Sequence, residues 1–253
     1  MWQTVRNDRL FLILLLALIA VAWLSLWIWG QSPYERYLDH EELTSVSGED
    51  AALLLFFVAG WTLMIFAMML PTTLPLMAMF RTVVSSRSNQ AQLIGLLILG
   101  YTMVWTGFGV VIHLGDILVH EGAEQIGWLE SNNWVIGAGT LIGAGVYQFT
   151  PLKYHCLDKC RSPFSFISSH WSGGNELAQA FRLGADHGLF CVGCCWTLML
   201  LMFGVGAGNL GWMLLLGSVM AVEKNLPWGR RISAPLGMIL IGGGGLITIL
   251  HFL

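Results

Sequence analysis

Three of the chain's five cysteines lie within five residues of one another. They are Cys191, Cys194 and Cys195 of the segment HGLFCVGCCWTLM, which begins at His187. At about 100° per residue, a helix places these cysteines on one face with His187 and Met202. Thiolates and thioethers are ligands for soft metal ions, Cu(I) above all, and thiolate with imidazole also suits Zn²⁺. The spacing therefore predicts a metal site or a redox site on this face.

Soft donors also occur in two other segments. The segment MIFAMMLPTTLPLMAMF carries Met68 and Met69 ahead of a proline, and KYHCLDKCRSPF carries Cys156 and Cys160 at CxxxC spacing. Each has an ordinary alternative, because methionine fills core gaps and CxxxC is not a zinc-ribbon spacing. Glu223 ends a further apolar run beside a lysine, and a solvated interfacial pair is its simplest interpretation. The predicted metal ligands are Cys191, Cys194, Cys195, His187, Cys156, Cys160, Met68, Met69, Met202 and Glu223.

The composition indicates the setting in which these residues lie. Hydrophobic residues make up 56 % of the 253 residues and charged residues only 11 %, with a mean hydropathy of +0.69. Soluble domains carry about 25 % charged residues, so we expect a single membrane domain, residues 1–253. The formal net charge of −3 argues against nucleic acid as a partner.

Apolar runs predict an all-α, polytopic bundle of transmembrane helices. A membrane-spanning helix needs about 20 mostly apolar residues. Seven runs approach or exceed this length, and six spans result if the shortest, 208–222, is re-entrant. We interpret the first run as an uncleaved anchor, because its apolar stretch exceeds a signal-peptide core and no cleavage site follows. The runs are 10–30, 51–80, 92–112, 133–151, 184–206, 208–222 and 232–253.

The distribution of basic residues predicts the orientation. With the N-terminus in the cytoplasm and the C-terminus outside, eleven of the twelve basic residues fall on the cytoplasmic side, as the positive-inside rule expects. Only Arg36 falls outside. The cytoplasmic set is Arg6, Arg9, Arg81, Arg87, Lys153, Lys159, Arg161, Arg182, Lys224, Arg230 and Arg231.

This topology brings the predicted ligands to the cytoplasmic half of the bundle. The CxxxC segment becomes a cytoplasmic loop, and residues 173–188 become an interfacial segment that Asn175 caps. We expect Gly184 and Gly188 to let that segment bend into the fifth span. The second, fifth and sixth spans should then line one cavity, with Met68 or Met69 near the cysteines and Glu223 at its mouth. Because the cytosol keeps thiols reduced, the cysteines are available as ligands.

Several of these segments together resemble a known family. HGLFCVGCCWTLMLLMFGVG with NLGWM and EK, AMMLPTTLP, and CLDKCRSPFSF are similar to a bacterial family of predicted metal-binding integral membrane proteins, a domain of unknown function with a GCCW motif. The resemblance extends from the second span to the seventh. It implies metal binding by the five cysteines and Glu223. One departure is Gly208, where the family often has methionine before the asparagine.

We expect a multi-pass protein of the bacterial inner membrane that binds a soft metal, with copper favoured over zinc, for transport or delivery. The alternatives are a membrane thiol-redox protein and an accessory or assembly subunit of a larger complex. Expected partners are the bilayer, the metal ion, and a membrane complex or metallochaperone. No P-loop is present, which argues against primary pumping by this chain alone. No catalytic motif is present either; we assign no catalytic residue, and whether the chain is an enzyme stays open.

The orientation is testable with reporter fusions. A reporter fused after Arg87 or Arg161 should read cytoplasmic, and one fused after Glu121 should read external, because of the eleven-to-one division of basic residues. An external reading after Arg161 would overturn the cytoplasmic placement of the cysteines.

Overall fold

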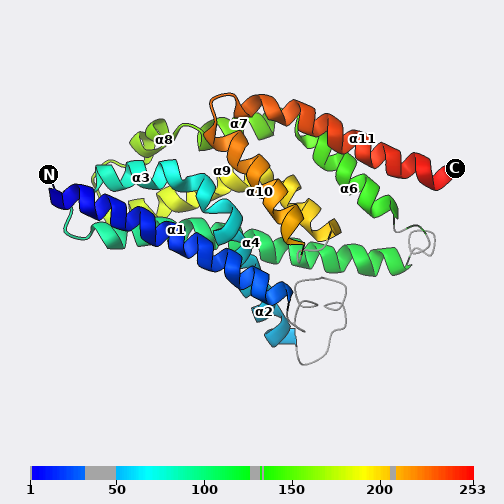
Figure 1. Ribbon diagram of the computed structural model, residues 1–253, viewed down its shortest axis with the longest axis horizontal. Helices are drawn as coiled ribbons and strands as arrows, with labels where there is room; N and C mark the ends of the chain where they lie inside the picture. Colours follow the sequence, from blue (N-terminus) through cyan, green and yellow to red (C-terminus); the bar gives the residue numbers. More distant parts are fainter. Residues whose placement is uncertain (1, 32–49, 126–131, 133, 206–208) are drawn as a thin grey trace.

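The computed structural model describes residues 2–31, 50–125, 132, 134–205 and 209–253, and the regular elements of these residues are all helical. The prediction of an all-α chain is thus confirmed for this part. The two ends of the chain lie at opposite ends of an elongated bundle (Figure 1). The elements are α1 Trp2–Gly30, α2 Asp50–Met64, η3 Ile65–Met69, η4 Pro71–Thr73, α3 Leu74–Val83, α4 Gln90–Gln125, α6 Trp134–Tyr147, α7 Pro151–Cys160, α8 Pro163–His170, α9 Glu176–Val205, α10 Leu210–Asn225, η5 Gly229–Ile232 and α11 Ser233–Phe252.

Several helices are long and apolar enough to cross a membrane. Within the described residues there are four of them, and up to six if each of two bent helix pairs counts as one span. The four and the first bent pair correspond to predicted runs, whereas the second bent pair matches the run 133–151 only through α6. The remaining run forms α10, whose 16 residues extend about 24 Å, less than the bilayer's apolar core of about 30 Å. A seventh span therefore stays a prediction. The four are Phe11–Gly30, Gln90–Gly115, Glu176–Met202 and Gly229–Phe252.

The first bent pair is broken at Pro71, the proline that follows Met68 and Met69. A π-helical turn, η3, and a 3₁₀ turn, η4, separate α2 from α3, and the two halves meet at 44°. Proline has no N–H to donate, so carbonyls in the preceding turn lose their helical partners. Side chains add hydrogen bonds at the break. Thr72 Oγ1 donates to the Met69 carbonyl at 2.7 Å, and the Leu70 carbonyl accepts from both Thr73 Oγ1 at 2.8 Å and the Thr73 N–H at 3.0 Å.

A carbonyl of the π-helical turn also receives a hydrogen bond from another helix. Trp23 of α1 donates its Nε1–H to the Ala67 carbonyl at 3.1 Å. The break is therefore stabilised by its neighbours, as a non-helical backbone inside a membrane bundle must be.

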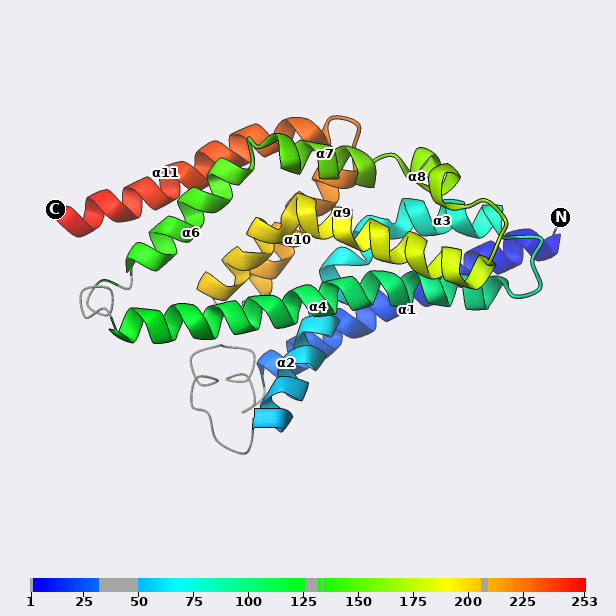
Figure 2. The same ribbon diagram turned by 180° about the vertical axis from the view of Figure 1, so that it is seen from behind.

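The second bent pair corrects the prediction of a loop at residues 153–164, whose cytoplasmic location stays a prediction. Most of that segment is helix: α7 follows α6 at a bend of 66°, and α8 begins at Pro163. Thr150 caps α7 by accepting a hydrogen bond from the Lys153 N–H at 3.3 Å. The segment reads as a polar loop from its sequence, but Lys153 and Leu157 are fully buried because α7 packs on α9. Figure 2 shows α7 running between α6 and α8 over α9.

Helix α9 also differs from its predicted form. It is one continuous helix, so the expected separate interfacial segment and bend are wrong, although Asn175 does cap it by accepting from the Ala178 N–H at 3.3 Å. Its glycines serve close packing against α4 instead. A Cβ on Gly184 would overlap the Leu97 carbonyl, and one on Gly188 would lie 3.0 Å from the Val104 side chain.

Helices α6 and α11 form a second close pair, side by side in both ribbon views (Figures 1 and 2). A Cβ on Gly244 would lie 2.8 Å from the Ala138 carbonyl, and one on Gly145 would lie 2.8 Å from the Gly237 carbonyl. Small residues therefore allow backbone contact here, as they do in many membrane helix pairs. Gly242, Gly243 and Gly245 face open space.

The packing of α4 on α9 is testable by adding one methyl group. Gly184→Ala should destabilise the protein by about 1–3 kcal/mol, because the new Cβ overlaps backbone that cannot move aside easily. The measurement is thermal or denaturant unfolding of the detergent-solubilised protein.

Gly107→Ala on α4 is the matched control. No atom lies within 4 Å of a Cβ there, so it should be neutral or stabilising by up to about 1 kcal/mol through helix propensity. Equal effects of the two substitutions would contradict the close approach of α4 and α9.

Candidate metal centre

The three cysteines of α9 lie in the centre of the bundle. Cys191, Cys194 and Cys195 are each at most 1 % exposed and belong to one apolar core cluster. Cys194 Sγ–H donates to the Cys191 carbonyl at 3.1 Å, and Cys195 Sγ–H donates to the same carbonyl at 2.8 Å. The Cys194 and Cys195 sulfurs are 3.8 Å apart. The helix therefore holds these two thiols beside one another, as the spacing predicted.

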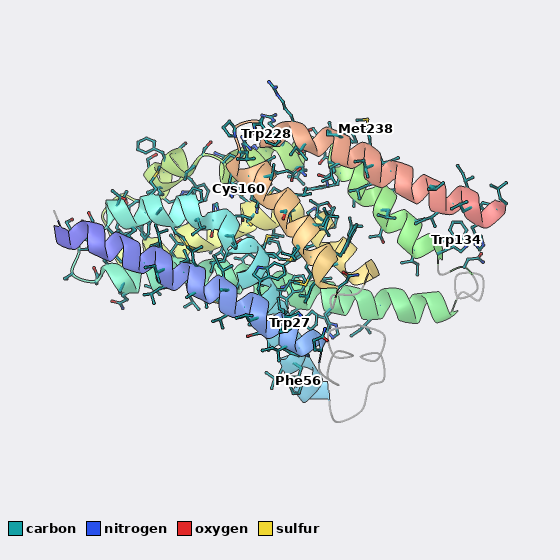
Figure 3. All side chains as sticks on the ribbon, in the orientation of Figure 1. Trp27, Phe56, Trp134, Cys160, Trp228 and Met238 are labelled. Atoms are coloured by element: carbon teal, nitrogen blue, oxygen red, sulfur yellow. The ribbon has the colours of Figure 1, made fainter. Side chains whose placement is uncertain are left out.

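Helix α7 brings a fourth sulfur to this cluster. Cys160 Sγ lies 4.0 Å from Cys194 Sγ, where the end of α7 meets α9 near the start of α8 (Figure 3). Cys156 takes a different position, one turn earlier. Its sulfur lies against Gly193, whose missing side chain leaves room for it, because a Cβ there would be 2.6 Å from Cys156 Sγ. The two cysteines of the CxxxC segment therefore make different contacts.

Cys191 has two polar neighbours that the sequence did not identify. Lys224 of α10 donates from Nζ to Cys191 Sγ at 2.8 Å and to Thr72 Oγ1 at 3.3 Å. The Tyr101 hydroxyl of α4 lies 3.0 Å from the same sulfur and also donates to the Met69 carbonyl at 3.4 Å. The Cys191 sulfur thus lies between an ammonium and a phenol, both buried.

This arrangement suits the ionised form of Cys191. A buried ammonium needs a charged or strongly polar partner. A thiolate is the form of cysteine that binds metal ions, and the ammonium of Lys224 would balance its charge. Lys224 was interpreted from the sequence as half of a solvated pair, so its position in α10 beside a glutamate gave no sign of this contact.

Glu223 makes its side-chain contacts with Lys153 and Ser233, and its place at the mouth of the cysteine cavity stays a prediction. Its carboxylate accepts from Lys153 Nζ at 2.9 and 3.1 Å and from Ser233 Oγ at 2.7 Å, and it is 2 % exposed. Lys153 Nζ also donates to Gln148 Oε1, and Arg161 donates to the backbone carbonyl of Glu223. The predicted solvated pair with Lys224 is therefore wrong, because the two neighbours are buried and have different partners.

The remaining predicted ligands surround the cluster without a demonstrated bond to it. Met68, Met69 and Met202 are at most 2 % exposed and belong to the same apolar core as the cysteines. Met68 packs against Gly217 of α10. His187 is buried one turn before Cys191, with its ring 6.0 Å from Tyr101. Within the described residues its Nδ1 has no hydrogen-bond partner.

The donor set suits a soft ion of low coordination number better than a tetrahedral one. In the described part of the chain, no three His, Cys, Asp or Glu side chains are arranged around a common metal position. A metal–thiolate bond is about 2.3 Å long, so one ion can contact both Cys160 and Cys194 across their 4.0 Å separation. Sulfur donors with little else favour Cu(I).

The fold is an all-helical bundle with adjacent thiols in its core, and such thiols are suitable ligands for soft metal ions. The sequence profile of the PpoB2 family, described as copper chaperones, matches residues 58–247. The chain therefore belongs to the PpoB2 copper chaperone family. No curated protein and no solved structure matches the chain. The matched range begins in α2 and ends in α11, and it includes all the cysteines. Gly208, the departure from the resembled family, lies outside the described residues.

The buried Lys153–Glu223 pair is testable through stability. Glu223→Gln leaves the Lys153 ammonium without its charge partner, and we expect a loss of about 3–5 kcal/mol in the free energy of unfolding. The combined change Glu223→Gln with Lys153→Met should restore part of that loss, because the uncompensated charge is gone.

The exposed pair of Arg230 and Asp158, 3.0 Å apart and about half exposed, is the matched control. Asp158→Asn should cost no more than about 1 kcal/mol. Similar losses at Glu223 and Asp158 would show that the buried pair does not contribute as described.

Proposed function

We propose that this protein binds Cu(I) through the sulfurs of Cys160, Cys191, Cys194 and Cys195 and delivers it to a partner. The observation that carries the proposal is the contact of Lys224 Nζ with Cys191 Sγ at 2.8 Å, one helical turn before Cys194. Cys194 Sγ in turn lies 3.8 Å from Cys195 Sγ and 4.0 Å from Cys160 Sγ. The family match adds an independent link to copper.

The chemistry of delivery follows from the donors. Cu(I) moves between proteins by ligand exchange, in which a new copper–sulfur bond forms as an old one breaks. Adjacent sulfurs supply the successive ligands, and the ammonium of Lys224 offsets their negative charge. Burial excludes water, and the thioethers of Met68, Met69 and Met202 offer further soft donors within the same core.

The setting that we propose is the bacterial inner membrane, with seven spans, the N-terminus in the cytoplasm and the C-terminus outside. The eleven-to-one division of basic residues supports it. The four long apolar helices and two bent pairs supply six spans, and α10 supplies the seventh. Its limited length is compatible with a span if Asn209, its N-cap, and Trp228 after its end lie at the two interfaces.

Delivery fits the chain better than primary pumping does. No nucleotide-binding motif is present, so net movement of copper would depend on a gradient or on a partner. Helix α11 offers a small-residue face for another membrane helix, because a Cβ on Gly242, Gly243 or Gly245 would meet no atom within 4 Å. We therefore propose a partner within the membrane as the recipient.

A thiol-redox protein is the second candidate, and one observation favours it. Cys160 Sγ and Cys194 Sγ are 4.0 Å apart on different helices, so a small movement would allow a disulfide. All five cysteines are free thiols here. A redox role requires this disulfide to form reversibly, whereas a copper role requires both thiols to stay reduced.

Metal analysis separates these candidates. The protein, purified under reducing conditions and loaded with Cu(I), should retain copper in stoichiometric amount against a competing chelator. The combined variant Cys191→Ser, Cys194→Ser, Cys195→Ser should lose it, because hydroxyls are poor ligands for soft ions. Elemental analysis for copper and zinc is the measurement.

Cys156→Ser is the matched control and should retain copper, because the Cys156 sulfur packs against Gly193. Zinc bound in place of copper, and lost only when Cys156 and Cys160 are also replaced, would indicate a structural zinc site. Absence of both metals with a trapped Cys160–Cys194 disulfide would favour the redox candidate.

A further inference from the structure

A polar pocket of about 320 Å³ lies between α7, α8 and α9. Its volume is at the lower end of the range of small-molecule sites, roughly 300–1,000 Å³. Nothing in the copper proposal so far uses it. The lining includes Lys159, Ser165, Phe166, His170, Asp186 and Phe190.

Two residues that line the pocket are sequence neighbours of cysteines in the thiol cluster. Lys159 directly precedes Cys160, and Phe190 directly precedes Cys191. All five cysteines are described, and Cys160 is the partly exposed one while the other four are buried. Its sulfur is also the one that lies 4.0 Å from Cys194 Sγ. Cys160 is therefore the thiol of this group that a ligand from outside can reach most easily.

The walls of the pocket offer charges of both signs and several hydroxyls. Lys159 is exposed and contributes an ammonium. His170 Nε2 lies 3.2 Å from Asp186 Oδ2, and Ser169 Oγ lies 2.9 Å from His170 Nδ1. Such a mixture suits a small molecule that carries carboxylate and ammonium groups, and it does not suit an apolar ligand.

We propose that this pocket receives Cu(I) as the complex of a small anionic thiol, and that Cys160 is the first protein ligand to accept the ion. The inference rests on the proposed copper function. It adds the chemical class of the donor and the point of loading. Lys159 would bind a carboxylate of the donor, and the pocket would hold the copper-bound sulfur beside Cys160.

The transfer is a ligand exchange without a change of oxidation state. The bond between Cu(I) and the donor's sulfur breaks as a bond to Cys160 Sγ forms, the Cys160 thiol proton passes to the departing thiolate, and copper stays Cu(I). Cys194, 4.0 Å away, then takes the ion inward, and Cys195 lies 3.8 Å beyond. Each exchange thus occurs between sulfurs close enough to share one ion.

The test compares two copper donors on reduced, metal-free, full-length protein in detergent. One donor is the Cu(I) complex of glutathione and the other is the labile Cu(I) complex of acetonitrile. Lys159→Ala should slow loading from the glutathione complex by about tenfold, the effect of losing about 1.4 kcal/mol of binding free energy. Loading from the acetonitrile complex and the final copper content should match the unchanged protein.

Arg230→Ala is the matched control, because Arg230 is another exposed cation and lies outside the pocket lining. It should leave loading from both donors unchanged. Cys160→Ser should slow loading from both donors, because the first acceptor is missing. Growth of copper–thiolate absorption with time gives the rates, and an unfolding curve for each variant verifies the fold.

Two results separate this inference from the function on which it rests. Equal loading rates for Lys159→Ala and the unchanged protein from the glutathione complex would overturn the pocket inference and leave copper binding intact. Absence of copper uptake from either donor would overturn the proposed function, and the pocket inference with it.

Discussion

The buried ammonium of Lys224 is the constraint on which the rest of the site depends. A charge inside an apolar bundle is costly unless a partner balances it. The adjacent carboxylate of Glu223 is already bound by Lys153 and Ser233. The contacts left to Lys224 are Cys191 Sγ and Thr72 Oγ1, and of these two a thiolate can supply the negative charge. The ammonium of Lys224 would therefore stabilise the thiolate form of Cys191, and that thiolate would stabilise the buried ammonium. A thiolate is also the form of cysteine that binds soft metal ions.

The folding of the chain brings this pair together from distant segments. Glycines on α9 allow α4 to approach closely, which places Tyr101 beside Cys191. The broken helix at η3 and η4 places the Met69 carbonyl and Thr72 at the same point, bonded to Tyr101 and Lys224. The irregular backbone of the second apolar run is thus tied to the sulfur site by its hydrogen bonds, and α7 adds Cys160 from the other side.

The sequence predicted those features that local pattern determines. The helical class, the four long apolar helices, the Asn175 cap and the shared position of Cys194 and Cys195 all follow from periodicity and residue type. Long-range pairing was not predictable in the same way. The sequence predicts solvated cations at Lys153 and Lys224, because their partners lie far away in the chain. Glu223 is 70 residues from Lys153, and Cys191 is 33 residues from Lys224. Helix α7, which buries Lys153, Cys156 and Leu157, resembles a polar loop in sequence for the same reason, and Tyr101 carries no motif.

The geometry, the soft donors and the family support our proposal of a membrane protein that holds Cu(I) among sulfurs and passes it on. Its central claim is that the bound ion has sulfur ligands from α9 and α7. X-ray absorption at the copper edge of the Cu(I)-loaded protein tests this most directly. We predict a low-coordinate Cu(I) centre whose nearest shell is sulfur, and a loss of that shell when Cys191, Cys194 and Cys195 are replaced by serine. A shell of nitrogen or oxygen, or one that survives the triple replacement, would contradict the account.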